Sequence, residues 1–183
     1  FKGVDYVFHL AAMTNTIESF KKSREYFKNN VDGTLNILNI IKKLKIKKFI
    51  YSASASCYGN QKKIPINESA KINLLNPYAR SKYKAEQLLF KSSKVNNFPI
   101  ISLRFFNVYG TQMKSRGIYN SVINIFSSQK RKNIPLTIVG NGEQTRDFIY
   151  VSDVIDALFK AGLSKKTGEI YNLASGTETK VMY

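Results

Sequence analysis

Tyr78 and Lys82 are the side chains in this sequence whose type and spacing could support acid–base chemistry. They stand four residues apart in a segment that predicts a helix, because Asn76 is a good N-cap and Pro77 is favoured at the first helical position. Residues at this spacing share one helical face. A cation beside a phenol lowers the phenol pKa from about 10. Such a tyrosine could take a proton from an alcohol at neutral pH.

The four-residue spacing indicates a functional pair only where the intervening backbone is helical. Lowering a phenol pKa to about 7 takes roughly 4 kcal/mol, which a lysine and a second positive charge can supply at close range in a partly desolvated cleft. In a lysine-rich chain the same spacing also arises by chance, and Tyr58 and Lys62 repeat it. Gly59 and Asn60 break any helix between that second pair, so its side chains need not share a face.

Length and composition indicate one domain with a real core. The chain has 183 residues, of which 43% are hydrophobic, and no apolar run is long enough to span a bilayer. Cys57 is its only cysteine, which excludes an internal disulfide and suits a reducing compartment. We therefore expect a cytoplasmic location. No cluster of carboxylates and histidines has metal-ligand spacing, so no metal is implied.

The net charge of +17 raises the question of nucleic-acid binding. The excess is mostly lysine, spread along predicted helices, and its densest cluster (residues 42–48) closes one helix and opens a strand. Lysine is favourable at a helix C-terminus. No helix-turn-helix, zinc-finger or aromatic RNA-binding motif accompanies it. We expect no nucleic-acid or membrane partner, and instead attraction of an anionic substrate.

The elements that must position Tyr78 alternate between strands and helices. We predict strands over residues 4–12, 48–54, 100–106, 136–140 and 169–174. An amphipathic stretch over 17–29 is followed by helices over 31–44, from Tyr78 onward, 119–130 and 151–163, with loops or turns over 59–77, 107–110 and 140–147. This alternation favours an α/β fold with a doubly wound parallel sheet.

In such sheets, ligands bind beyond the carboxyl ends of the strands. Residues 9–14, 52–56 and 107–110 each follow an apolar strand, so we expect them to line one crevice beside the Tyr78 helix. A dinucleotide site of this kind also needs a glycine-rich turn for the pyrophosphate. No Gly-x-Gly-x-x-Gly segment occurs in the chain.

Six successive segments carry a family resemblance: HLAA, NNVDGTLNIL, FIYSASASCYG, NPYARSKYKAE, LRFFNVYG and GEQTRDFIYVSDV. In order and spacing they resemble the motifs of the extended short-chain dehydrogenase/reductases, in the nucleotide-sugar epimerase/dehydratase branch. That family has its glycine-rich turn before the HLAA segment, so we expect this chain to be a fragment, incomplete at both ends and inactive alone. Residues 1–110 would be the second part of an NAD-binding Rossmann domain, and residues 111–183 a substrate-binding segment mixed with returning Rossmann elements.

The resemblance implies catalytic roles for Ser54, Tyr78 and Lys82. Tyr78 would be the general base on a sugar hydroxyl, and Lys82 would bind the nicotinamide ribose and depress the phenol pKa. Ser54 would hydrogen-bond the reacting hydroxyl, although a strand-end serine can instead bond to the backbone. The implied cofactor is NAD, which stays bound and is regenerated in each cycle.

Further positions of this sequence match the family's cofactor and substrate contacts. Three of these positions also have a purely structural interpretation. Asn30 could cap the following helix, Phe106 could equally pack in the core, and Arg146 could pair with Asp147. For His9, at a strand end, we expect a structural role. The implied cofactor positions are Leu10, Ala11, Ala12, Thr14, Asn30, Tyr78, Lys82 and Phe106, and the implied substrate positions are Ser54, Asn107, Asn120, Thr137, Ile138, Val139 and Arg146.

One departure from the family pattern bears on the reaction. Dehydratases and decarboxylases of this branch carry a Glu, often preceded by Asp, two residues before the tyrosine that matches Tyr58, where this chain has Ala55 and Ser56. We therefore expect an NAD-dependent nucleotide-sugar epimerase, a UDP-sugar 4-epimerase acting through a transient 4-keto intermediate and dimeric in full length. The alternatives are another nucleotide-sugar oxidoreductase or dehydratase of the family, or a non-catalytic nucleotide-sugar or NAD sensor.

Overall fold

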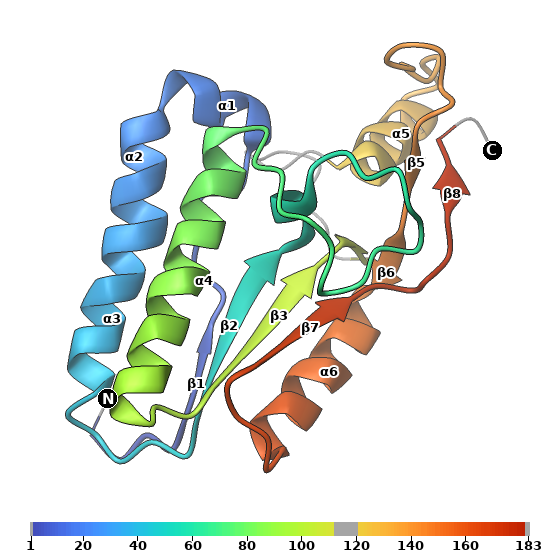
Figure 1. Cartoon of the computed structure of the whole chain (residues 1–183). Helices are drawn as coiled ribbons and strands as arrows, with labels where there is room; N and C mark the ends of the chain where they lie inside the picture. Colours follow the sequence, from blue (N-terminus) through green and yellow to red (C-terminus); the bar gives the residue numbers. More distant parts are fainter. Residues whose placement is uncertain (1, 112–120, 182–183) are drawn as a thin grey trace.

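A four-stranded parallel sheet forms the centre of the molecule, in the computed structural model that describes residues 2–111 and 121–181 (Figure 1). Its strand order is β1-β2-β3-β7, with β1 (Tyr6–His9), β2 (Lys48–Ser54), β3 (Ile100–Phe105) and β7 (Glu169–Leu173). Two small sheets lie beyond its carboxyl ends: β4 (Asn107–Tyr109) runs parallel to β6 (Phe148–Tyr150), and β5 (Thr145–Arg146) antiparallel to β8 (Thr179–Lys180).

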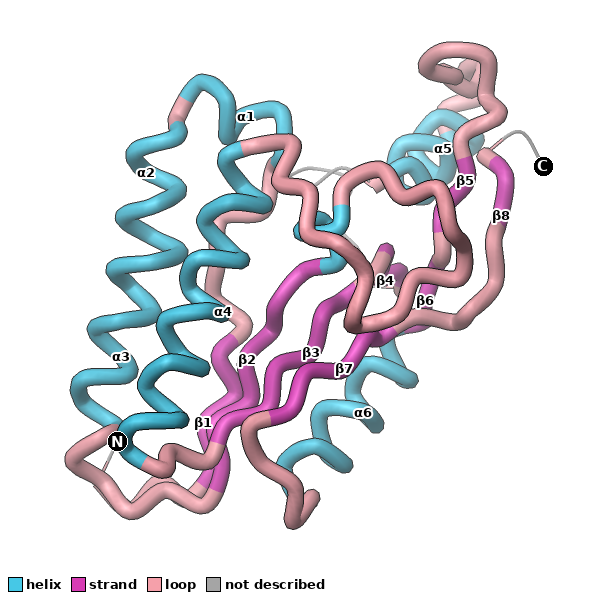
Figure 2. The backbone as a smooth tube through the Cα atoms, viewed as in Figure 1, coloured by secondary structure: helices cyan, strands magenta, loops and turns pink. Residues whose placement is uncertain are grey.

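Helices cover both faces of the central sheet (Figures 1 and 2). Helices α3 and α4 pack on one face and α6 on the other, which confirms the predicted doubly wound α/β fold. The helical elements are α1 (Thr16–Lys21), α2 (Ser23–Phe27), the π-helical turn η1 (Lys28–Asp32), α3 (Gly33–Ile41), the 3-10 turn η2 (Ala55–Tyr58), α4 (Pro77–Asn96), α5 (Val122–Arg131) and α6 (Val151–Leu163).

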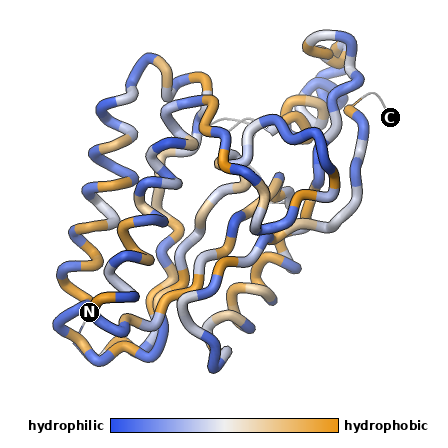
Figure 3. The backbone as a smooth tube through the Cα atoms, in the orientation of Figure 1, coloured by the Kyte–Doolittle hydropathy of each residue, from blue (hydrophilic) through white to orange (hydrophobic). Residues whose placement is uncertain are grey.

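The two hydrophobic clusters follow from the alternation of side chains along β2. Phe49 and Tyr51 point to the cluster shared with α3 and α4, and Ile50 points to the cluster under α6. All three side chains are fully buried. A strand buried on both faces needs apolar residues at successive positions, which β2 has. Hydrophobic and hydrophilic residues alternate along the helices that cover the sheet (Figure 3).

Helix α4 begins and ends as its sequence predicts. The side-chain oxygen of Asn76 accepts a hydrogen bond from the Ala79 amide at 2.8 Å, and Pro77 occupies the first turn. The helix ends at Asn97, which has the left-handed φ of 50°. Tyr78 therefore lies in the first turn of a well-capped helix.

The predicted separation of two helices near Asn30 is wrong. Residues 23–41 are helical throughout, because η1 connects α2 to α3. Asn30 lies within this π-helical turn and is buried, so its alternative role as an N-cap is also wrong. π-helical turns often occur at functional sites, and this one frees the Asn30 side chain for contacts outside its own helix.

The segment around residues 107–147 departs most from its prediction. Residues 136–139 are not a strand, since no neighbouring strand among the described residues pairs with them, and β-propensity alone does not make a strand. The predicted turn at 107–110 instead contains β4, and the predicted loop at 140–147 contains β5. Of the described helices, none is both long and apolar enough to cross a membrane.

Candidate active site

The carboxyl ends of the central strands and the amino end of α4 lie at the same edge of the sheet, where the crevice is predicted (Figure 1). The parallel register aligns His9 with Tyr51, and Ser54 with Phe105. The segments that follow β1, β2 and β3 therefore leave the sheet at one edge. Helix α4 packs against both β2 and η2, so its first turns lie at that edge.

Tyr78 and Lys82 share the face of α4 that is turned to β2, as their spacing predicts. Lys82 is 4% exposed, and its Nζ lies 4.4 Å from the centroid of the Tyr51 ring. Tyr78 is half-buried and meets the Tyr26 ring edge-on, with centroids 6.5 Å apart. The pKa of Tyr51 is raised well above its ordinary value, chiefly by burial and further by Tyr78 and Glu86, which places Tyr78 near the same ring.

The charge on Lys82 is set by its surroundings. From the sequence Lys82 is expected to be a cation, but burial lowers the pKa of Lys82 to about 7, while Glu86 opposes this shift. The protonated and neutral forms are then of comparable population at neutral pH. The nearby Tyr51 ring face favours the protonated form. An amine that titrates near pH 7 in a buried site is typical of functional positions.

Ser54 ends β2 and caps the 3-10 turn that follows. Its Oγ accepts hydrogen bonds from the backbone amide of Ser56 at 3.3 Å and from the Ser56 hydroxyl at 2.9 Å. The backbone-bonded alternative for Ser54 is therefore observed. It does not use up the hydroxyl, because within the described chain the Ser54 Oγ accepts both bonds and donates none. A donor remains for a ligand atom.

Asn30 ties the segment after β1 to helix α4. Its oxygen accepts from the Met13 amide at 2.8 Å, and its Nδ2 donates to the Met13 carbonyl at 3.0 Å and to Ser81 Oγ at 2.9 Å. This fixes the backbone of the predicted cofactor segment. Of its predicted positions, two are exposed and two half-buried: Leu10, Ala11, Ala12 and Thr14.

His9 has the structural position expected for it. The ring is buried, and its Nε2 lies 2.8 Å from the Thr34 hydroxyl. Burial, and secondarily Lys82, lowers the pKa of His9 to about 4. His9 is therefore neutral at physiological pH.

The predicted substrate positions after β3 are partly organised. Phe106 and Asn107 are half-buried, and the Asn107 side chain donates to the Asp147 carbonyl at 2.8 Å. Arg146 is exposed on β5, and its guanidinium donates to the Thr145 carbonyl at 2.7 Å. The alternative pairing of Arg146 with Asp147 is not formed. The Asp147 carboxylate instead accepts bonds from Ser175 and Gly176, which lie in the segment after β7.

Residues 137–139, three further predicted substrate positions, lie apart from α4 (Figure 1). Thr137 is held by Gln129 of α5, whose Nε2 donates to the Thr137 hydroxyl at 2.6 Å. Ile138 and Val139 are exposed, Val139 by 76%. Asn120 lies outside the described residues.

Sequence reasoning missed a buried polar network behind Lys82. It joins Glu86 of α4 to Arg104 of β3, and Arg104 to Tyr58 of η2. Two signals could have indicated it: Glu86 follows Lys82 by one helical turn, and Arg104 is a charge inside an apolar strand, where it needs a partner.

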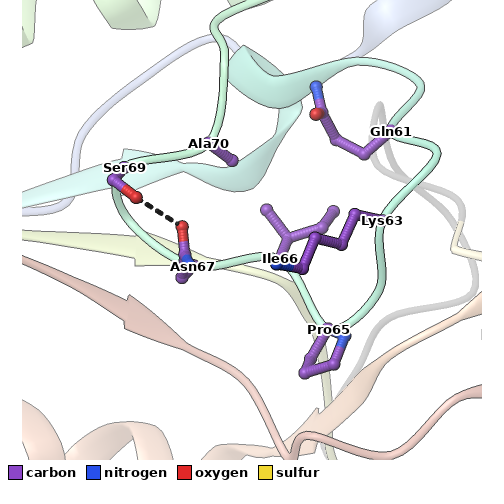
Figure 4. Close-up of a pocket in the computed structure, with 7 residues that line it drawn as sticks. All are labelled: Gln61, Lys63, Pro65, Ile66, Asn67, Ser69 and Ala70. Carbon is purple, nitrogen blue, oxygen red and sulfur yellow. Dashed lines mark hydrogen bonds between the residues drawn. The ribbon is translucent and has the colours of Figure 1, made fainter.

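The loop after η2 encloses a pocket of about 290 Å³ (Figure 4). Within it, the Ser69 hydroxyl donates to the Asn67 side chain at 2.8 Å. Its lining holds none of the predicted site residues, so the pocket is separate from the candidate active site. The lining residues are Gln61, Lys63, Pro65, Ile66, Asn67, Ser69 and Ala70.

Comparison with known proteins decides the family. The sequence model of the NAD dependent epimerase/dehydratase family matches residues 1–174. The chain belongs to this family. A putative UDP-glucose 4-epimerase of Methanocaldococcus jannaschii is 38% identical to it over 182 residues, which are 99% of this chain and 59% of that protein.

Two solved structures of epimerases extend the comparison to three dimensions. The UDP-N-acetylglucosamine 4-epimerase of Methanobrevibacter ruminantium M1, in complex with UDP-N-acetylmuramic acid, matches with a TM-score of 0.93 at 33% identity, over 97% of this chain and 57% of that one. The UDP-glucuronic acid 4-epimerase of Bacillus cereus, in complex with UDP-glucuronic acid and NAD, matches with a TM-score of 0.91 at 32% identity, over 99% and 57%. This member of the epimerase/dehydratase family thus spans rather more than half the length of these relatives.

Proposed function

We propose that this chain belongs to an NAD-dependent nucleotide-sugar epimerase, a UDP-sugar 4-epimerase that acts through a transient 4-keto sugar. The observation that carries the proposal is the Lys82 amine, buried beside the Tyr51 ring and one turn from Tyr78 on the same face of α4. The relatives support it, since the compared proteins are named as 4-epimerases of UDP-sugars.

The chain's own residues divide the proton chemistry among them. Tyr78 takes the proton from the sugar hydroxyl when that carbon is oxidised to a ketone, and it returns the proton when the ketone is reduced on its other face. The protonated Lys82 stabilises the phenolate form of Tyr78. The Ser54 hydroxyl, which has its donor free, bonds the reacting oxygen.

The residues after β1 fit a dinucleotide cofactor. Asn30 bonds to both polar atoms of the Met13 backbone and to Ser81 of α4, so this segment is tied to α4. Ala11 and Ala12 have small side chains, which allow close approach to the backbone. With Leu10, Thr14, Phe106 and Lys82 they would hold the nicotinamide end of NAD. When bound, NAD supplies the hydride acceptor and donor.

We assign the nucleotide diphosphate to the other side of the crevice. Arg146 exposes a planar guanidinium, which matches phosphate oxygens in pairs. Asn107 donates to the carbonyl of Asp147, the residue that follows Arg146, and would contact the same diphosphate. Asn120 and residues 137–139 would hold the nucleotide. The net charge of +17 favours a substrate that carries two phosphate charges.

An epimerase is favoured over a dehydratase by the composition of η2. Its first residues, Ala55 and Ser56, supply no carboxyl group to assist loss of water. Two accompanying parts of the proposal rest on the sequence: a cytoplasmic location, which suits the lone Cys57, and a homodimer, which the family resemblance implies.

The test uses the whole protein, with any segments that flank this chain, and supplies UDP-galactose or UDP-N-acetylgalactosamine without added NAD. We expect the 4-epimer to form, as resolved by chromatography or NMR, with no accumulation of NADH absorbance. Formation of a 4-keto-6-deoxy sugar would indicate a dehydratase. Binding of NAD and nucleotide sugar without any turnover would indicate a sensor.

A further inference from the structure

Glu86 is a buried carboxylate one helical turn beyond Lys82. It is 2% exposed, and its Oε1 accepts from Arg104 Nη2 at 2.5 Å. Its Oε2 accepts from Arg104 Nε at 3.2 Å and from the Ser102 hydroxyl at 2.8 Å. Two residues of β3 thus grip both carboxylate oxygens, in the bidentate geometry that is strongest for arginine.

The same arginine is fixed from its other side. Arg104 Nη1 donates to the Tyr58 hydroxyl at 2.7 Å, and that hydroxyl donates to the Asn172 side chain at 2.7 Å. The guanidinium also lies 5.0 Å from the Tyr58 ring centroid. Among the described residues every buried side-chain nitrogen or oxygen has a hydrogen-bond partner. The Glu86 carboxylate therefore has one defined position on α4.

The groups around Lys82 leave Glu86 as its counter-charge. His9 of β1 and Tyr51 of β2 lie on the sheet side of Lys82. His9 is neutral at pH 7, and burial raises the pKa of the Tyr51 phenol. On α4 itself stand Tyr78 and Glu86. Of these groups, Glu86 is the carboxylate whose charge raises the pKa of Lys82, and the Tyr51 ring face adds an uncharged contact to the protonated amine.

We propose that Glu86, held in place by Arg104, is a positioning residue that keeps Lys82 protonated beside Tyr78. An ammonium buried between a helix and a sheet loses its hydration, and a carboxylate fixed one turn away partly offsets that loss. Without it, Lys82 becomes neutral and no longer favours the phenolate. The consequence for turnover rests on the proposed function, whereas the charge state of Lys82 does not.

The charge state is measured directly by NMR titration of the whole protein carrying 13Cε-labelled lysine. The Lys82 resonance is assigned by its loss in Lys82→Arg. In Glu86→Gln, which keeps the size of the side chain and removes its charge, we expect the titration midpoint of Lys82 to fall by about one pH unit or more. The alkaline limb of kcat should move to lower pH by the same amount.

Arg104→Gln is the matched control, because it breaks the same ion pair and leaves the carboxylate. We expect the Lys82 midpoint to stay where it is or to rise, since Glu86 is then no longer shared. An unchanged midpoint in Glu86→Gln overturns the proposal, and so does an equal fall in both variants. If the Lys82 midpoints shift as expected but the protein turns over no nucleotide sugar, the proposed function is rejected and the role of Glu86 is supported.

Each single variant leaves a buried charge unpaired, which destabilises a fold strongly. If either variant fails to fold, the double variant Glu86→Gln with Arg104→Met removes both charges together and is titrated in the same way. A lowered Lys82 midpoint in it supports the role of Glu86, and a wild-type midpoint rejects it.

Discussion

Two Tyr-x-x-x-Lys pairs occur in this chain, and they have different structures. Tyr78 and Lys82 lie on one face of α4, with Lys82 buried against the sheet. Tyr58 ends the 3-10 turn η2 and is fully buried, whereas Lys62 is exposed in the loop beyond Gly59. The same spacing places two side chains together only where the backbone continues as a helix. The comparison leads to matched variants at both pairs.

The largest difference is expected between the two tyrosines. In the whole protein, Tyr78→Phe should lower kcat for epimerisation by about 10³-fold, because the proton acceptor is lost. Tyr58→Phe should retain catalysis but lower the free energy of unfolding by about 1–3 kcal/mol, since its hydroxyl joins Arg104 to Asn172. Steady-state kinetics and denaturant unfolding measure the two effects. Equal losses of activity in both variants would contradict the assignment.

The two lysines provide the next comparison. Lys82→Met should lower kcat by about 10²-fold, because the phenolate loses its stabilising charge, and Lys62→Met should leave it unchanged. Lys82→Met should also raise the free energy of unfolding at pH 7. Burial lowers the pKa of Lys82 to about 7, so the folded state binds fewer protons than the unfolded state between pH 7 and 10.5. The gain is therefore greatest below pH 7 and fades toward pH 10.5.

A substitution at Gly59 tests why the backbone between Tyr58 and Lys62 is not helical. The φ of Gly59 is 57°, and a Cβ there would lie 2.4 Å from the Asn73 carbonyl oxygen. Gly59→Ala should destabilise the fold by about 2–3 kcal/mol in denaturant unfolding. Gly168→Ala is the control, because its φ is 72° with no atom within 4 Å of an added Cβ. It isolates the backbone strain, which should cost about 1 kcal/mol.

His9 gives an effect that is confined to acidic pH. Because its pKa is lowered to about 4, the folded state binds fewer protons than the unfolded state between pH 6.5 and 4. The burial of His9 therefore lowers the free energy of unfolding as the pH falls from 6.5 to 4. Above pH 6.5 its titration has no effect on stability. His9→Gln, which can still bond to Thr34, should reduce the loss by roughly 1 kcal/mol per pH unit. Parallel slopes for wild type and variant would show that His9 titrates normally.

Much of the fold and part of the site could be predicted because the deciding interactions are local. The cap at Asn76 and the absence of breakers define α4, and the i, i+4 spacing sets the common face of Tyr78 and Lys82. The alternation of strands and helices predicts the parallel sheet, and therefore the edge at which Ser54 and the segment after His9 meet. The order of the motifs was sufficient to indicate the family.

Tertiary structure decided what depends on residues far apart in the chain. Asn30 bonds to Met13 and to Ser81, which are 17 and 51 positions away in the sequence. No pattern in the residues next to Asn30 therefore indicates these bonds or the π-helical turn that contains it. Residues 137–139 have strand-forming side chains, but no strand in the described part of the chain pairs with them. The charge of Lys82 is set by burial against β2 and by a carboxylate that β3 holds in place. Desolvation and long-range pairing are properties of the packed molecule, so a single sequence does not display them.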